Sequence, residues 1–143
     1  EIGGVLVLDD FAHHPTAVRE TIQGIRQRYP DRRLWAVFEP RSNTSRRNIH
    51  QAEYSTAFDE ADVVCIRVPE PHDKVPADQQ LDVGAIVQTL RARGIEAEAR
   101  SDVPELVQLV SSGARPGDVI LVMSNGAFGG FIPMLLETLA ARR

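Results

Sequence analysis

The sequence predicts an α/β domain with a mostly parallel sheet of about five to six strands, flanked by helices. Short apolar runs alternate with helical patterns along the whole chain of 143 residues. Four of the five runs are nearly continuous in valine, isoleucine and leucine, as in strands covered on both faces. The alternation indicates βαβ units with right-handed crossovers, and the length is sufficient for one domain with its own core.

The strands are expected where apolar runs are short and bounded by turn residues. The run EAEAR alternates and is polar, so it is expected to form an edge strand. The five expected strands are residues 5–8, 34–39, 62–68, 96–100 and 118–124.

The helices are expected between these strands, and several of their ends carry characteristic residues. The first begins at Pro15, which suits a first helical turn, and ends before Pro30. The third stops at Gly94, and the fourth begins at Ser101 or Asp102, where a glutamate three residues on can complete a capping box. The second to fifth helices are expected at about 46–60, 82–93, 101–113 and 131–141.

Composition and charge exclude several classes of protein. The hydrophobic fraction of 43% and the charged fraction of 25% are ordinary for a globular domain. The net charge is −4 and Lys74 is the only lysine, which argues against a nucleic-acid surface. Cys65 is the single cysteine, so no internal disulfide can form, and it is expected to be a buried small hydrophobe.

No apolar run approaches the roughly 20 residues of a membrane span, and no secretory leader opens the chain. We therefore expect a cytoplasmic protein that contacts neither nucleic acid nor membrane. Because the first strand follows Glu1 within a few residues, we also expect the chain to be a piece of a longer protein.

The loops that follow the apolar runs hold the candidate site. In parallel sheets, ligands bind beyond the carboxyl ends of the strands. The loops at that edge are DDFAHH (9–14), PRSNTSR (40–46), PEPHDK (69–74) and SNGAFGG (124–130). Three of these loops contain, or lie near, all the histidines of the chain, which are His13, His14, His50 and His72.

Asp9 and Asp10 end the first strand and point to opposite faces, so only one of them needs to enter a site. A carboxylate there can bind ribose hydroxyls, bind a metal, or fix the loop and cap the next helix, and residue type alone leaves these open. His14 is expected to cap the helix that begins at Pro15, while His13 packs or binds an anion. Adjacent histidines rarely reach one ion, so no metal site is expected in this chain.

Two further loops suit anionic ligands. EPRSNTSRR carries Arg41, Arg46 and Arg47 ahead of a helix, and is either an anion site or a solvated basic turn. SNGAFGG is either a turn that binds phosphate or carboxylate, or a simple tight turn. The chain contains no G-x-x-x-x-G-K-[ST] pattern, so it has no nucleotide-binding P-loop of that kind. It also contains no G-x-S-x-G pattern, so it has no nucleophile elbow of the α/β-hydrolase type.

The run DDFAHHPTAV resembles the signature D-[YF]-[AG]-H-x-P, which opens the C-terminal domain of the Mur ligases. These enzymes build the peptide stem of bacterial cell-wall precursors. FEPRSNTSRR and MSNGAFGGF are most similar to the branch of the family that recycles murein peptides. The resemblance covers essentially the whole chain and implies a Rossmann-like, three-layer domain over residues 1–143, cut from a three-domain protein.

The resemblance implies an ATP-dependent ligase that joins the tripeptide L-Ala-γ-D-Glu-meso-diaminopimelate to UDP-N-acetylmuramate. ATP phosphorylates the substrate carboxylate, and the incoming amine attacks the acyl phosphate to form an amide. The first domain binds the UDP-sugar, and the central domain carries the ATP loop and the Mg²⁺ ligands. The C-terminal domain closes over the ATP and presents the amine, so this chain alone is expected to be inactive. The alternatives are an L-alanine-adding Mur ligase and a stand-alone anion-binding module.

The resemblance also implies roles for individual residues. Asp10 matches the aspartate that contacts the ATP ribose, with His13 and His14 near the nucleotide, and no residue of this chain is expected to act chemically. The D-N-P-R motif that binds diaminopimelate in the ligase adding that residue singly is absent, and PEPHDK occupies the comparable region. The residues expected to face the incoming peptide are Arg41, Asn43, Thr44, Arg46, Ser124, Asn125 and Phe128.

Overall fold

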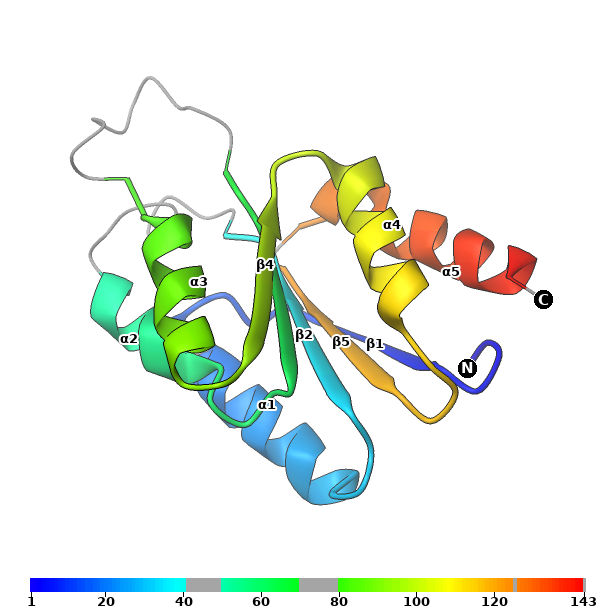
Figure 1. The fold of residues 1–143 in the computed structure, drawn as a ribbon, viewed down its shortest axis with the longest axis horizontal. Coiled ribbons are helices and arrows are strands. Elements are labelled where there is room, and N and C mark those ends of the chain that lie inside the picture. Colours follow the sequence, from blue (N-terminus) through cyan, green and yellow to red (C-terminus); the bar gives the residue numbers. More distant parts are fainter. Residues whose placement is uncertain (41–49, 70–79, 125, 143) are drawn as a thin grey trace.

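One parallel sheet lies between two layers of helices in the computed structural model, which describes residues 1–40, 50–69, 80–124 and 126–142 (Figure 1). The strands are β1 (Leu6–Asp10), β2 (Leu34–Phe38), β3 (Val63–Arg67), β4 (Glu96–Arg100) and β5 (Val119–Met123). The helices are α1 (Pro15–Arg28), α2 (Gln51–Ala57), α3 (Val83–Ala92), α4 (Val103–Gly113) and α5 (Phe131–Ala141), with a 3-10 turn, η3 (Phe128–Gly130), before α5. This architecture confirms the predicted Rossmann-like α/β class.

The strand order is β1-β5-β2-β3-β4, and every neighbouring pair is parallel. β5 is last in the chain yet lies between the first two strands, where Leu121 pairs with both Leu8 and Ala36. The prediction that residues 96–100 form an edge strand is confirmed. The first strand is also covered on both faces, because Leu6 and Leu8 pack against one core cluster and Val7 packs against the other. Its residues 6–8 are only half-buried, because β1 is the other edge and has a neighbour on one side only.

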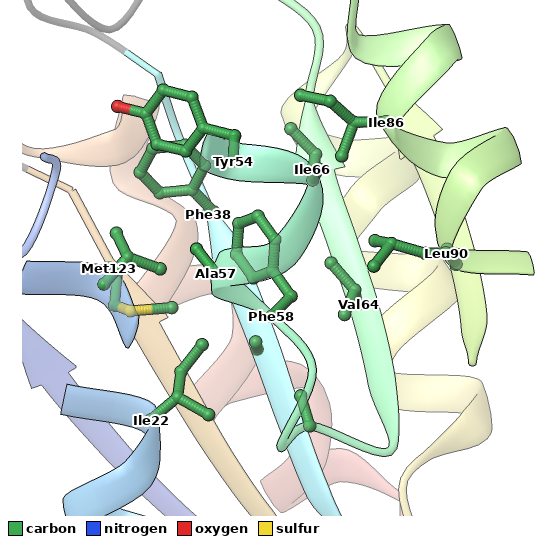
Figure 2. Packing of buried hydrophobic residues seen from close by; sticks show 14 of the residues in the cluster. Ile22, Phe38, Tyr54, Ala57, Phe58, Val64, Ile66, Ile86, Leu90 and Met123 are labelled. Atoms are coloured by element: carbon green, nitrogen blue, oxygen red, sulfur yellow. The ribbon is translucent and has the colours of Figure 1, made fainter. Parts of the chain in front are cut away.

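Helices α1, α2 and α3 pack on one face of the sheet, and α4 and α5 pack on the other. On the first face, the ring of Phe38 lies 5.4 Å from that of Tyr54 and 5.7 Å from that of Phe58, between centroids (Figure 2). On the second face, Leu106 of α4 and Phe131 of α5 belong to the other core cluster. Because both faces are buried, the central strands are apolar at successive positions.

The helix ends use the residues that the sequence indicated. Pro15 opens α1, and Nδ1 of His14 accepts a hydrogen bond from the Thr16 amide at 3.2 Å, which confirms the predicted cap. Oδ2 of Asp102 accepts from the Glu105 amide at 3.1 Å, so α4 begins as predicted. Residues 46–49 of the helix expected at 46–60 lie outside the described residues. None of the helices in the described ranges is long and apolar enough to cross a membrane.

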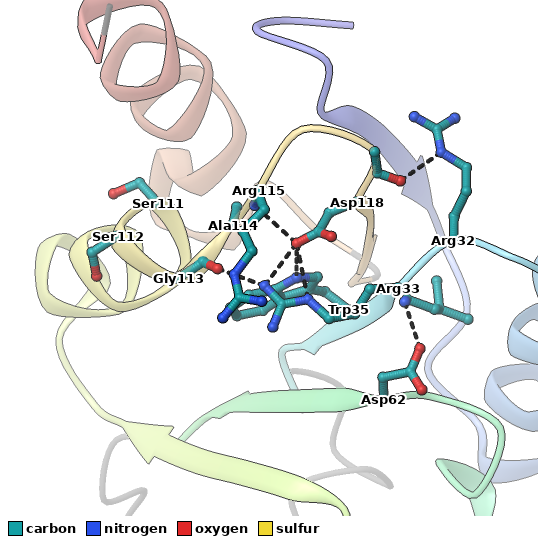
Figure 3. A network of polar contacts seen from close by, with 12 residues as sticks. Arg32, Arg33, Trp35, Asp62, Ser111, Ser112, Gly113, Ala114, Arg115 and Asp118 are labelled. Atoms are coloured by element: carbon teal, nitrogen blue, oxygen red, sulfur yellow. Dashed lines mark hydrogen bonds and ion pairs between the residues drawn. The ribbon is translucent and has the colours of Figure 1, made fainter.

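Asp118 directly precedes β5 and lies at the end of the sheet where the parallel strands begin, called here the amino edge (Figure 3). Its side chain is buried, and Oδ2 accepts hydrogen bonds from Arg33 Nη2 at 2.8 Å, Trp35 Nε1 at 2.9 Å and the Arg115 amide at 3.0 Å. Burial alone would raise the pKa of Asp118. The hydrogen bonds from Arg33, Arg115 and Trp35 outweigh burial and hold the pKa below its ordinary value of 3.8. This network lies at the opposite end of the strands from the candidate loops.

Candidate functional site

The carboxyl ends of β1, β5, β2 and β3 lie side by side. Backbone hydrogen bonds continue just past the strands. The Ser124 amide donates to the Asp10 carbonyl at 3.1 Å, and the Glu39 amide donates to the Met123 carbonyl at 3.0 Å. The chain segments after β1, β2 and β5 therefore leave the sheet at neighbouring points, at the edge where parallel sheets bind ligands.

Asp10 lies at this edge with a fixed carboxylate. Its Oδ1 accepts a hydrogen bond from the Ala12 amide at 2.8 Å, so the side chain shapes its own loop. Among the described residues, its Oδ2 has no hydrogen-bond partner and is available to hydroxyl groups of a ligand. Asp9, by contrast, is exposed. Sequence reasoning gave no role to the next residue, Phe11, whose side chain is 79% exposed.

The two adjacent histidines are held by different contacts. The backbone carbonyl of His13 accepts a hydrogen bond from the Tyr54 hydroxyl, which ties the loop after β1 to α2. Nδ1 of His13 lies 3.0 Å from the Phe11 carbonyl. The ring of His14 packs edge-on against that of His50, with centroids 4.6 Å apart. His14 thus uses one ring nitrogen for the α1 cap.

Histidines are common metal ligands. Over the described residues, no group of three or more His, Cys, Asp or Glu side chains is placed to hold a metal ion. His50 contacts Glu53 instead, with Nδ1 and Oε1 3.1 Å apart. His72 lies outside the described residues.

A polar cluster, Glu39–Arg67–Ser124, joins the ends of three strands, and sequence reasoning missed two of its members. Glu39 follows β2 and is 5% exposed. Its Oε2 lies 2.5 Å from Nη1 of Arg67 at the end of β3, and its Oε1 accepts from the Ser124 hydroxyl at 2.6 Å. Their positions could have indicated Glu39 and Arg67 as candidates, because each lies at the carboxyl end of a buried strand, where parallel sheets bind ligands.

The structure places Ser124 and Phe128 in the segment between β5 and α5. Ser124 is buried, and its hydroxyl also accepts from the Gly126 amide at 3.1 Å. Phe128 has a φ of 52° and a buried side chain, whose ring lies 4.9 Å from that of Phe131 between centroids. Both side chains therefore point into the protein.

The remaining residues expected to face a peptide lie outside the described residues. These are Arg41, Asn43, Thr44, Arg46 and Asn125, and the same holds for Lys74 in PEPHDK. Their roles stay predictions.

A family of known proteins matches most of the chain. The family model described as "Mur ligase, glutamate ligase domain" matches residues 1–126. The chain belongs to the Mur ligases. It corresponds to the C-terminal domain of these ATP-dependent, amide-forming enzymes, which confirms the resemblance seen in the motifs.

Individual Mur ligases are similar to this domain over nearly its whole length. UDP-N-acetylmuramate–L-alanyl-gamma-D-glutamyl-meso-2,6-diaminoheptandioate ligase from Escherichia coli (strain K12) is 39% identical over 99% of the chain. UDP-N-acetylmuramate–L-alanine ligase from Anaeromyxobacter sp. (strain Fw109-5) is 35% identical over 99%. The crystal structure of a murein peptide ligase from Psychrobacter arcticus 273-4 matches 97% of the chain with a TM-score of 0.79 at 33% identity. The chain spans only 29%, 30% and 28% of these three proteins, respectively.

This Mur ligase domain also has a groove away from the carboxyl edge. The groove has a volume of about 630 Å³ and lies beside α4, over the first halves of β2, β3 and β4. Its lining includes Trp35, Cys65 and Glu98. The Cys65 thiol is buried as predicted, and burial, with a smaller contribution from Glu98, raises its pKa to about 12. The candidate site remains at the carboxyl edge, where the polar groups converge.

Proposed function

We propose that this domain belongs to a ligase that joins L-Ala-γ-D-Glu-meso-diaminopimelate to UDP-N-acetylmuramate with ATP, through an acyl phosphate. The observation that carries the proposal is the 39% identity, over 99% of the chain, to the Escherichia coli enzyme named for this tripeptide. In this proposal the domain closes over ATP and presents the incoming amine. The two preceding domains bind the UDP-sugar, the ATP phosphates and Mg²⁺, and the enzyme works in the cytoplasm.

The loop after β1 suits the nucleoside part of ATP. A carboxylate accepts hydrogen bonds from ribose hydroxyls, and the Oδ2 atom of Asp10 is positioned for this by the bond between Oδ1 and the Ala12 amide. The exposed ring of Phe11 beside it offers an apolar face on which a base can stack. His13 and His14 flank this loop.

The segments after β2 and β5 suit the peptide. The tripeptide carries three carboxylates, and guanidinium groups bind carboxylates through paired hydrogen bonds. We assign this role to Arg41 and Arg46, with Asn43 and Thr44 as hydrogen-bonding neighbours. Ser124, Asn125 and Phe128 lie in the segment that we propose to hold the incoming amine. Orientation of the amine and exclusion of water on closure then account for the contribution of this domain to catalysis.

A second candidate is an L-alanine-adding ligase, which the 35% identity to the Anaeromyxobacter enzyme supports. The deciding experiment measures ATP-dependent phosphate release by the full-length protein with UDP-N-acetylmuramate. Either the tripeptide or free L-alanine is offered as the acceptor, and residues 1–143 alone serve as the inactive control. We expect turnover with the tripeptide. Turnover with L-alanine alone would establish the second candidate, and release with neither would leave an anion-binding module.

A further inference from the structure

We propose that Glu39 is a positioning residue, which sets the segment of residues 126–130 through the Ser124 hydroxyl. Under the proposed function this segment faces the incoming amine, so the inference rests on that function and deepens it. Glu39 itself is buried and touches no substrate. It acts on the reaction only through the shape of the backbone that follows β5.

The first argument is a continuous chain of hydrogen bonds. The Ser124 hydroxyl donates its proton to Oε1 of Glu39 at 2.6 Å, and the Ser124 hydroxyl oxygen accepts a hydrogen bond from the Gly126 amide at 3.1 Å. Because its proton is committed to Glu39, the hydroxyl presents a lone pair to Gly126 in a fixed direction. The carboxylate therefore determines where the chain turns after β5.

The second argument is the position of Arg67, which lies against the same segment. A Cβ atom built on Gly129 would come within 3.3 Å of Nη1 of Arg67 and within 3.0 Å of a methyl group of Val103. Gly129 has a φ of 55°, so the backbone can approach the guanidinium this closely only at a glycine. The Glu39–Arg67 pair therefore lies close to Gly129, in addition to the hydrogen-bonded link from Glu39 through Ser124.

The charges argue against a direct role for Arg67 in binding the peptide. Its guanidinium is 2.5 Å from the buried carboxylate of Glu39, so the pair is neutral as a unit. A neutral pair offers little to a substrate with three carboxylates, whereas it can fix a backbone segment in one arrangement.

The chain contains a matched control at the other end of β5. Asp118 is buried to the same degree as Glu39, at 4% and 5% exposure, and it also pairs with an arginine, with Arg33 Nη2 2.8 Å away. Asp118 lies at the amino edge, far from the candidate site. Glu39 and Asp118 variants should therefore lose stability alike and differ in their effect on the reaction.

The experiment compares Glu39→Ala, Glu39→Gln, Ser124→Ala and Asp118→Asn in the full-length enzyme, below the unfolding temperature of each variant. Glu39→Ala and Ser124→Ala are expected to lower kcat/KM for the tripeptide about 10- to 100-fold, with KM for ATP changed less than about threefold.

Three further variants serve as controls. The Glu39→Ala/Ser124→Ala double variant should have a kcat/KM no lower than that of Glu39→Ala, because both substitutions break the same chain of hydrogen bonds. Glu39→Gln keeps an acceptor for Ser124 and should retain more activity than Glu39→Ala. Asp118→Asn should leave kcat/KM within about twofold.

Amide hydrogen exchange supplies a readout that does not depend on the substrate. Exchange at residues 126–130 should be faster in Glu39→Ala and Ser124→Ala and unchanged in Asp118→Asn. Equal exchange in all variants, or kinetic losses that match those of Asp118→Asn, would overturn the inference. If the wild-type enzyme uses L-alanine, the proposed function fails, and the kinetic comparison is made with L-alanine. If it uses neither acceptor, hydrogen exchange alone decides whether Glu39 sets the segment.

Discussion

The indole nitrogen of Trp35 donates a hydrogen bond to Oδ2 of Asp118 at 2.9 Å, and the same oxygen accepts from Arg33. Replacement of Asp118 by Asn removes the charge that Arg33 faces at a buried position. We expect Asp118→Asn to lower the free energy of unfolding by about 2–4 kcal/mol. The measurement is urea unfolding of residues 1–143, followed by circular dichroism.

The control for this prediction is an exposed ion pair. Asp59 and Arg93 are 2.7 Å apart, but their side chains are 50% and 37% exposed. Asp59→Asn should therefore cost less than about 1 kcal/mol. If both variants lost the same free energy of unfolding, burial would not be the reason that the Asp118 network stabilises the domain.

The same carboxylate predicts a dependence of stability on pH. Burial raises the pKa of Asp118. The hydrogen bonds from Arg33, Arg115 and Trp35 lower it by more than burial raises it, so the folded-state pKa lies below 3.8. A folded pKa below the unfolded pKa adds stability above the unfolded value, and this stability is lost as the pH falls toward the folded pKa. The difference in unfolding free energy between wild type and Asp118→Asn should shrink as the pH falls below 3.8. A difference that stays constant down to acid pH would refute this.

Two glycines in helices should respond in opposite ways to alanine. A Cβ on Gly113 would lie 2.7 Å from the Trp35 ring, whereas a Cβ on the exposed Gly24 in α1 would meet nothing within 4 Å. We expect Gly113→Ala to destabilise the domain by about 1–3 kcal/mol through overpacking. Gly24→Ala should stabilise it by about 0.5–1 kcal/mol through helix propensity. Thermal unfolding of both variants checks the pair, and a shift of both in one direction contradicts it.

The loop after β1 predicts changes in nucleotide binding. Asp10→Ala and Phe11→Ala should each raise KM for ATP in the full-length enzyme by about 3- to 10-fold, because a ribose contact or a stacking surface is lost. Phe11 is 79% exposed, so Phe11→Ala should leave the unfolding free energy unchanged. Asp9→Ala is the matched control, since the side chain of Asp9 leaves the strand on the opposite face. An unchanged KM in the Asp10 and Phe11 variants would remove this loop from the nucleotide site.

The sequence was sufficient to predict the elements and the edge of the sheet that holds the candidate site. Apolar runs between helical patterns are local signals, and so are caps such as His14 and Asp102. The place of β5 between β1 and β2 has no local signal, so the position of β1 at an edge of the sheet could not be predicted from its own residues. The contacts of Glu39 with Arg67 and Ser124 join residues 28 and 85 positions apart. They depend on the strand order, so they could not be predicted from any single segment.

The insertion of β5 has a consequence for how the chain is made. Strands β2, β3 and β4 can pair in the order in which they leave the ribosome, but β1 has no partner until residues 119–123 emerge. Until then two unpaired strand edges face the gap that β5 will fill, and such edges can pair with other chains. A product that stops after α4 is therefore expected to aggregate during synthesis, whereas one that loses only the end of α5 can still complete its sheet.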